Sequence, residues 1–176
     1  MAYIDLGDAA AEPGIRGLLR YRPETGRALM QLADALLRGD NAGDRELIAA
    51  YVSALNDCTF CHLSHAAVAA EHLPEGRPLV DAVLADPATA PISPRLRALL
   101  HLAAATRLDG HQVTEQLVAD ARDAGATDAE IHDTVLIAAA FSMFNRYVDG
   151  LGAFAPSDPA AYLPGAAHLA RHGYTR

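Results

Sequence analysis

The chain has 176 residues, of which 51% are hydrophobic, and a formal net charge of −8 at pH 7. This length suits a single domain, residues 1–176, and the hydrophobic content excludes a disordered chain. The negative charge argues against a nucleic-acid partner, because phosphates would be repelled. No apolar run approaches the roughly 20 residues of a membrane span, and no signal peptide is recognisable, so we expect a cytoplasmic protein with no membrane partner.

Helical patterns punctuated by proline and glycine fill the chain, and no alternating strand pattern appears, so an all-α fold is predicted. Residues 1–22 form an expected N-terminal arm with one short turn at 14–19. Helices are then predicted at 23–38, 44–55, 58–72, 78–85, 94–106 and 114–124, and a longest helix ends near Gly150. The proline-broken C-terminal tail, residues 156–176, is expected to lie over another surface.

Two of these boundaries have clear chemical signals. Ser93 and Pro94 predict a capped start with proline at the first helical position. Thr127 and Glu130 have the spacing of a capping box for the longest helix. Because that helix is apolar on most sides, we expect it at the centre of the fold. The two arms, residues 1–22 and 156–176, are too short to form cores of their own, so we expect them to wrap a neighbouring subunit of a homo-oligomer; folding back on their own chain is the alternative.

An internal repeat of one helical unit is a further hypothesis. An offset of 84 positions pairs four residues of each half: Glu46 with Glu130, Cys58 with Ser142, Cys61 with Asn145, and His65 with Asp149. A duplicated unit whose second copy lost its thiols would explain this pairing, and two ordinary amphipathic helices are the alternative.

The two cysteines of the chain, Cys58 and Cys61, stand three positions apart, and His65 follows four positions later. At about 100° per residue these three side chains fall within an arc of about 60° on one helix face. Asn56 or Asp57 can cap this helix, which would put both thiols in its first turns, where the helix dipole favours a thiolate.

This arrangement suits dithiol–disulfide chemistry. A thiolate attacks a peroxide O–O bond, and a second thiol nearby resolves the resulting sulfenic acid as a disulfide. His65 can exchange a proton with the thiol. Glu46 stands twelve positions before Cys58, on the preceding helix, and approaches His65 or Cys58 if the chain turns back at residues 56–57. We therefore predict Cys61, Cys58, His65 and Glu46 as catalytic residues.

Glu46, the twelve-residue step to Cys58, Cys61 and His65 together resemble the AhpD-like alkylhydroperoxidases of the carboxymuconolactone decarboxylase superfamily. The flanking segments, residues 45–56 and 144–150, resemble its uncharacterised peroxidase-related branch, and the likeness covers about residues 25–152. The resemblance implies an AhpD-like helical bundle that assembles as dimers or trimers of dimers. It also implies a thiol-dependent peroxidase that reduces hydroperoxides with a dithiol or thiol-protein reductant and needs no cofactor or metal.

The resemblance also implies a role for each residue. The residue matching Cys61 is peroxidatic, the one matching Cys58 resolves the intermediate and meets the reductant, and those matching Glu46 and His65 relay protons. Well-studied alkylhydroperoxidases carry a histidine immediately before the second cysteine, where this chain has Phe60, so the relay is shorter here. True carboxymuconolactone decarboxylases lack the cysteine pair, which argues against decarboxylation.

Other interpretations of the cysteine pair remain open at this stage. The segment from Cys58 to His62 matches the attachment signature of c-type haem, although such attachment requires export. Zinc could bind Cys58, Cys61, His65 and a fourth ligand, although no second cysteine pair exists. The pair could also be two buried cysteines without chemistry. The functional alternative to an enzyme is a non-catalytic, redox-responsive or metal-binding oligomeric protein.

Overall fold

The computed structural model describes residues 2–175, and all regular structure within that range is helical. The α-helices are, in chain order, α1 (Ile15–Tyr21), α2 (Pro23–Leu37), α3 (Ala42–Leu55), α4 (Thr59–His72), α5 (Arg77–Ala85), α6 (Pro94–Leu108), α7 (Glu115–Asp123), α8 (Asp128–Gly150) and α9 (Leu163–His172). Short 3-10 helices occupy Gly7–Ala11, Gly110–Gln112 and Pro159–Tyr162. The all-α prediction is confirmed.

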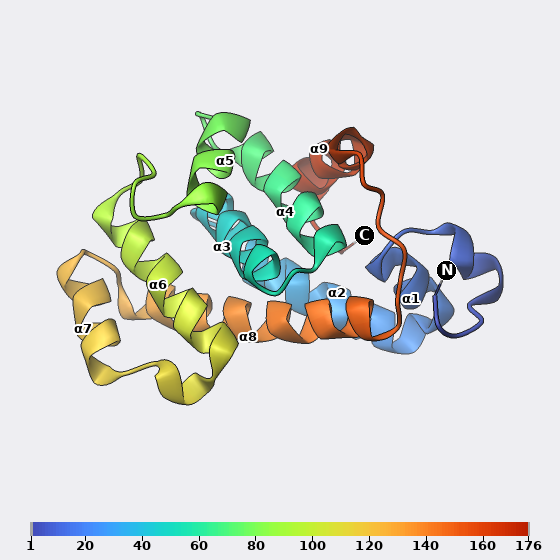
Figure 1. Cartoon of the computed structure of the whole chain (residues 1–176), viewed down its shortest axis with the longest axis horizontal. Coiled ribbons are helices and arrows are strands. Elements are labelled where there is room, and N and C mark those ends of the chain that lie inside the picture. The colour runs from blue at the N-terminus through green and yellow to red at the C-terminus, as the bar shows by residue number, and fades with distance from the viewer. Residues whose placement is uncertain (1, 176) are drawn as a thin grey trace.

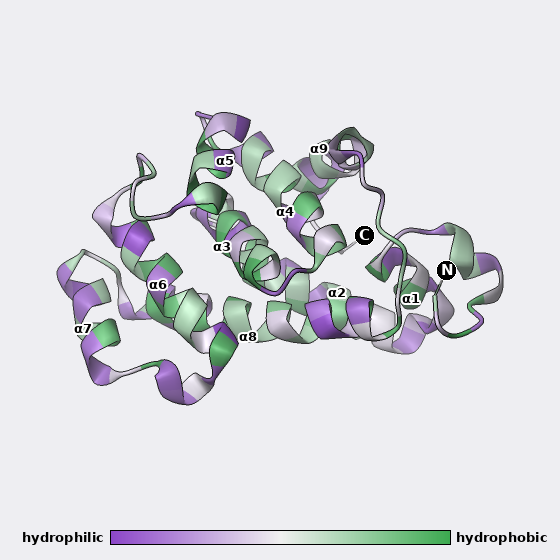
Figure 2. Cartoon of the chain, in the orientation of Figure 1, coloured by the Kyte–Doolittle hydropathy of each residue, from purple (hydrophilic) through white to green (hydrophobic). Residues whose placement is uncertain are grey.

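The pair α3 and α4 forms the most extensive helix–helix contact of the fold. The long α8 runs along one side of this pair and packs against α3, α6 and the N-terminal helices, while α9 packs on α4 (Figure 1). Ile137, Phe141 and Phe144 of α8 are buried, whereas Leu136 and Met143 are exposed, so α8 borders the core with one face rather than running through its centre as predicted. The peripheral α7 is mostly hydrophilic and buries little besides Ala121 (Figure 2).

The caps predicted for α6 and α8 form as expected. The Ser93 hydroxyl accepts a hydrogen bond from the Leu96 N–H at 3.1 Å, with Pro94 in the first turn of α6. Thr127 and Glu130 make both hydrogen bonds of a capping box at the start of α8. Because these bonds satisfy N–H groups that have no acceptor within the helix, they fix where α6 and α8 begin.

Partly buried ion pairs join α3, α6 and α8 at one end of the bundle. Arg95 of α6 contacts Asp44 of α3 at 2.6 Å and also Glu130 of α8. Arg45 of α3 contacts Asp133 of α8 at 2.6 Å. Arg45 therefore links α3 to α8 directly, and Arg95 links the same two helices through α6.

The cap predicted for α4 is wrong. Cys58 itself is the N-cap, no side chain caps the helix, and Asp57 takes a left-handed conformation with φ 58°. Asn56 instead donates its side-chain amide to the Asn145 carbonyl oxygen at 2.9 Å. The backbone N–H of Cys58 bonds back to the Ser53 carbonyl at 3.0 Å. The turn is consequently tight, and α4 runs back along α3.

Both arms contain helices that the sequence pattern did not predict, α1 in the N-terminal arm and α9 in the tail. Pro164 lies in the first turn of α9, where a missing N–H costs no helical hydrogen bond, so it starts the helix rather than breaking it. The tail packs on α4 of its own chain rather than extending away. Assembly into dimers or trimers of dimers stays a prediction.

The described residues form one large buried cluster and two smaller ones, of which the smallest, Leu6, Ala9 and Leu18, lies in the N-terminal arm. The large cluster joins α2, α3, α6 and α8, whereas the second surrounds the two cysteines. The second cluster contains Cys58, Phe60, Cys61, Ala67, Val68, Val148, Tyr162 and Ala166. The tail therefore closes over the helix that bears the thiols.

The proposed repeat pairs unequal elements. The segment from Glu46 to His65 spans α3, a turn and α4, whereas the paired segment from Glu130 to Asp149 lies within the single helix α8. The offset of 84 positions therefore does not superpose the same elements.

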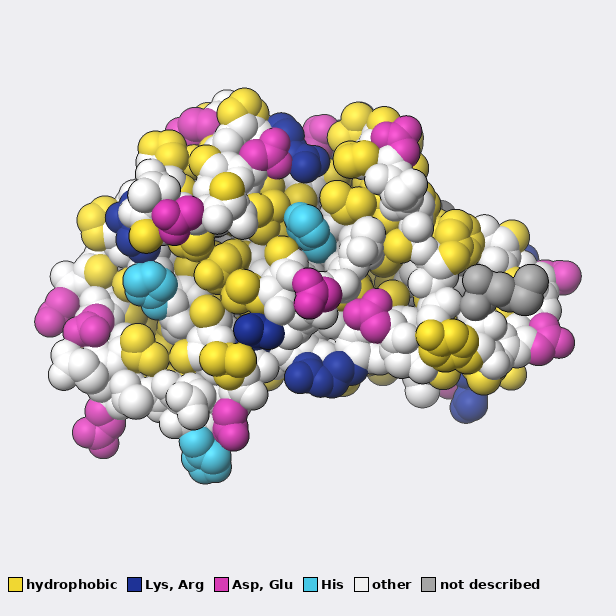
Figure 3. Space-filling model, viewed as in Figure 1, with side chains coloured by type: hydrophobic (Ala, Val, Ile, Leu, Met, Phe, Trp, Pro, Cys, Tyr) yellow, Lys and Arg dark blue, Asp and Glu magenta, His cyan; other side chains and the backbone are white. Residues whose placement is uncertain are grey.

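Among the described residues, no helix is long and apolar enough to cross a bilayer. Acidic side chains are scattered over the face shown in Figure 3 rather than gathered in one patch.

Gly14 tests how tightly the N-terminal arm closes on α4. It has φ 54°, and an added Cβ would lie 2.1 Å from the Phe60 ring. We expect Gly14→Ala to lower the free energy of unfolding by about 1–3 kcal/mol more than Gly7→Ala does. Gly7 is the matched control, because it has the same φ of 54° and no atom within 4 Å of its added Cβ. Equal losses in urea unfolding would show that the arm is loosely attached.

Candidate functional site

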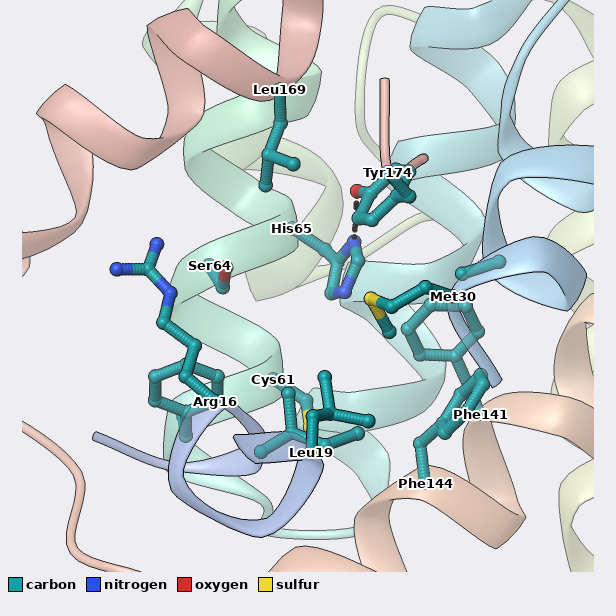
Figure 4. Close-up of a pocket in the computed structure, with 13 residues that line it drawn as sticks. Arg16, Leu19, Met30, Cys61, Ser64, His65, Phe141, Phe144, Leu169 and Tyr174 are labelled. Atoms are coloured by element: carbon teal, nitrogen blue, oxygen red, sulfur yellow. Dashed lines mark hydrogen bonds between the residues drawn. The ribbon is translucent and has the colours of Figure 1, made fainter. Parts of the chain in front are cut away.

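A cavity of about 110 Å³ lies between the N-terminal helices, α4, α8 and the tail. Its walls are mainly apolar, and the titratable side chains among its lining residues include Cys61, His65 and Tyr174, with Arg16 at one side (Figure 4). The apolar walls include Ile15, Leu19, Met30, Phe60, Phe141, Phe144 and Leu169. A ligand with a nonpolar group would therefore be desolvated beside a thiol and an imidazole.

The two thiols are neighbours in different surroundings. Cys61 lies in the first turn of α4 and lines the cavity, although it is only 3% exposed. Cys58 is fully buried at the N-cap and does not line the cavity. Both cysteines are free, and a hydrogen bond links their side chains. A ligand in the cavity thus meets Cys61 first, with Cys58 directly behind it.

The pKa of Cys61 is raised, which is opposite to the effect expected from the helix N-terminus. The hydrogen bond with Cys58 is the main cause, followed by burial and by the charge of Cys58. A hydrogen bond from Asn145 acts in the other direction and lowers it. The neighbouring thiol and burial therefore oppose the thiolate that the helix N-terminus was expected to favour, and a base that takes the proton would assist reaction near neutral pH.

Glu46 and His65 form a buried pair across α3 and α4. His65 Nδ1 lies 2.7 Å from Glu46 Oε2, and the imidazole packs edge-on against the Phe141 ring at 4.6 Å. This confirms that the turn at residues 56–57 brings Glu46 to His65. A proton on Nδ1 is required for a hydrogen bond to a carboxylate, so Nε2 is the ring nitrogen left to act as a base.

Tyr174 is a site residue that sequence reasoning missed. Its hydroxyl donates to Glu46 Oε1 at 2.7 Å and lies 3.3 Å from His65 Nδ1 (dashed line in Figure 4). Burial and the nearby Glu46 charge raise the pKa of Tyr174 well above its ordinary value, so the phenol stays protonated. No motif predicts this contact, because 128 residues separate Tyr174 from Glu46.

Asn145 and Asp149 of α8 complete the surroundings of the thiols. The Asn145 amide donates to the Ser53 hydroxyl at 3.0 Å and also reaches Cys61. Burial raises the pKa of Asp149, while a hydrogen bond with Cys58 opposes this increase. Both residues lie in the segment 144–150, which carries part of the family resemblance. That resemblance was the signal from which sequence analysis could have identified them.

The metal and haem interpretations gain no support from this geometry. Within residues 2–175, no group of three or more His, Cys, Asp and Glu side chains is placed to hold a metal ion. His65 turns its Nδ1 to Glu46. Covalent haem attachment requires both sulfur atoms at an accessible surface, whereas Cys58 is fully buried.

Comparisons with known proteins agree with this fold. The model of the carboxymuconolactone decarboxylase family matches residues 23–73 and 77–156. An uncharacterised peroxidase-related protein from Ralstonia eutropha JMP134, described as an alkylhydroperoxidase AhpD core, is 26% identical with a TM-score of 0.79, over 92% of this chain and 94% of that chain. An uncharacterised peroxidase-related protein from Silicibacter sp. TM1040 is 22% identical with a TM-score of 0.76, over 86% of this chain and 78% of that chain.

No curated protein matches the sequence. The predicted AhpD-like bundle is confirmed by the shared fold. The two segments matched by the family model hint at a duplication, but the helices do not correspond at the predicted offset of 84 positions.

The pKa of Cys61 can be tested through two variants with opposite effects. Cys58→Ala removes the main cause of the increase, so the pH of half-maximal alkylation of Cys61 by iodoacetamide should fall. Asn145→Ala removes a hydrogen bond that favours the thiolate, so this pH should rise. Mass spectrometry of the labelled peptide measures the alkylation of Cys61 in each variant as a function of pH. A shift in the same direction for both variants would mean that altered access, rather than the thiol environment, controls the reaction.

Proposed function

The chain belongs to the carboxymuconolactone decarboxylase family, and within it we propose that this protein is a thiol-dependent peroxidase that reduces organic hydroperoxides. One observation carries the proposal: a dithiol whose outer member, Cys61, lines an apolar cavity beside the Glu46–His65 pair. The description of the Ralstonia protein as an alkylhydroperoxidase AhpD core supports the same activity. Apolar cavity walls favour a hydroperoxide with a hydrocarbon group.

In the proposed cycle, Cys61 attacks the terminal oxygen of the hydroperoxide. An S–O bond forms, the O–O bond breaks, and the leaving alkoxide takes a proton to become an alcohol. The Cys58 sulfur then attacks the sulfenic acid, forming an S–S bond and releasing water. A dithiol or thiol-protein reductant finally returns two electrons and two protons to the pair by thiol–disulfide exchange.

His65 supplies the base that the raised pKa of Cys61 demands. Its free ring nitrogen takes the thiol proton and returns it to the leaving alkoxide, so the protonation state of the site is restored after each oxidation. Glu46 holds the ring in the required tautomer and stabilises the imidazolium that forms. Phe60 occupies the position of the additional histidine of well-studied relatives, so the proposed relay consists of one imidazole and one carboxylate.

Replacing each cysteine should separate the two steps. We expect Cys61→Ser to abolish hydroperoxide consumption, and Cys58→Ser to consume one equivalent and stop at a sulfenic acid. The measurement combines a coupled peroxide assay with mass spectrometry after sulfenic-acid trapping. Trapping on Cys58 in Cys61→Ser, with none in Cys58→Ser, would reverse the roles. The wild type should form an intramolecular Cys58–Cys61 disulfide, and recovery of free thiols alone would contradict the cycle.

The relay is testable by a double-mutant cycle. Glu46→Gln and His65→Phe should each slow turnover by about 10² or more, the usual contribution of a positioned base. Since both act through one proton path, the double variant should lose much less than the product of the single losses. His62→Phe is the matched control, because His62 lies on the same helix and does not line the cavity. Multiplicative losses would refute a shared path.

A redox-responsive binding protein without catalysis is the second candidate function, because two neighbouring free cysteines buried in the core could form a disulfide once without turnover. Such a protein would consume one peroxide per chain and then change its assembly. Repeated consumption in the presence of a dithiol donor therefore separates the two functions.

A further inference from the structure

The end of the C-terminal tail is fixed to α2 by hydrogen bonds beside the site. The Tyr174 and Thr175 backbone N–H groups donate to Asp34 Oδ1 of α2 at 2.7 and 3.3 Å. Burial alone would raise the pKa of Asp34, but these hydrogen bonds and the Arg38 charge lower it overall. Gly173 has φ 77°, and an added Cβ would lie 2.5 Å from Asp34 Oδ1, so only glycine fits this turn.

This anchor delivers the Tyr174 hydroxyl to Glu46. Tyr174 donates to Oε1 at 2.7 Å, while His65 Nδ1 lies 2.7 Å from Oε2. Each oxygen of the buried carboxylate thus has its own partner. Rotation of the carboxylate would break one of two charge-assisted hydrogen bonds away from water, so the group is held in one orientation.

The imidazole of His65 is held in the same way. The Tyr174 ring stacks beside it with centroids 6.0 Å apart and an interplanar angle of 20°. The Phe141 ring meets it edge-on at 86°. With Nδ1 committed to Glu46, the other ring nitrogen faces the cavity on the side where Cys61 lies (Figure 4).

We propose that Tyr174 is a positioning residue of this site, acting through Glu46 to keep His65 directed at Cys61. The part of this proposal that concerns peroxide rests on the proposed function, whereas the reactivity of Cys61 towards any electrophile does not. The phenol neither gains nor loses a proton in this role. The C-terminal tail becomes part of the reactive site, although its sequence lies outside the matched family segments.

The test compares two tail tyrosines whose hydroxyl groups are both bonded. In Tyr174→Phe, we expect the rate of Cys61 alkylation by iodoacetamide at pH 7.5 and the single-turnover rate with cumene hydroperoxide to fall about tenfold. A tenfold loss is about 1.4 kcal/mol. The pH of half-maximal alkylation should also rise. Tyr162→Phe is the control for loss of a bonded hydroxyl: the ring that packs on Phe60 beside the cysteines stays in place, and the lost hydroxyl donates to the Pro156 carbonyl at 2.9 Å and is bonded to neither Glu46 nor His65.

The Glu46→Gln variant, which lacks the carboxylate, distinguishes a positioning role of Tyr174 from a purely structural one. In Glu46→Gln, adding Tyr174→Phe should change the alkylation rate less than twofold, because the residue through which Tyr174 acts is already altered. A full further loss would mean that Tyr174 only supports the fold and would overturn the proposal, as would equal rates for Tyr174→Phe and Tyr162→Phe. If Tyr174→Phe folds poorly, a chain without residues 174–176 takes its place in the test. This truncated chain should show the same roughly tenfold fall in the rate of Cys61 alkylation. If the wild type reduces no hydroperoxide, the peroxidase function fails while the alkylation rates still decide this proposal.

Discussion

Glu46 places a carboxylate inside an apolar core at 2% exposure, and much of the local structure follows from that constraint. A buried carboxylate is tolerated only when hydrogen bonds replace its lost hydration. The tight turn before α4 brings His65 to one oxygen, and the tail brings Tyr174 to the other. The packing of α3 on α4 and the return of the tail over α2 therefore each bring one hydrogen-bond partner to the Glu46 carboxylate.

Much of the fold could be predicted from the sequence because its signals are local. Proline and capping residues mark the starts of α6 and α8, and these elements would be recognised in any context. The helix α1 escaped prediction because it is short, and short helices depend on tertiary packing rather than on propensity. The helix α9 escaped it because Pro164, which starts the helix, was interpreted as a break. The cap of α4 was misplaced for a related reason: the side chain of Asn56 is committed to Asn145, a contact between distant segments.

The same distinction between local signals and contacts of distant segments applies to the site. The spacing of Cys61 and His65 on one helix face is a local property, and so is the step to Glu46 once α3 turns back. Tyr174 comes from the far end of the chain and is fixed by an Asp34 contact across 140 residues, which no periodicity could reveal. The direction of the Cys61 pKa was also missed, because burial and a neighbouring thiol outweigh the effect of the helix terminus.

The raised pKa of Cys61 changes how the cysteine motif can react in this chain. A dithiol with an ionised outer thiol would react with any electrophile that reached it, whereas a protonated one reacts only where a base removes its proton. Cys58 helps keep Cys61 protonated and also stands ready to trap its oxidised form. Reactivity therefore depends on the orientation of His65, hence on Glu46, and hence on the contacts that hold its carboxylate. A chain with the same two cysteines but without this buried carboxylate would have the dithiol without the means to activate it.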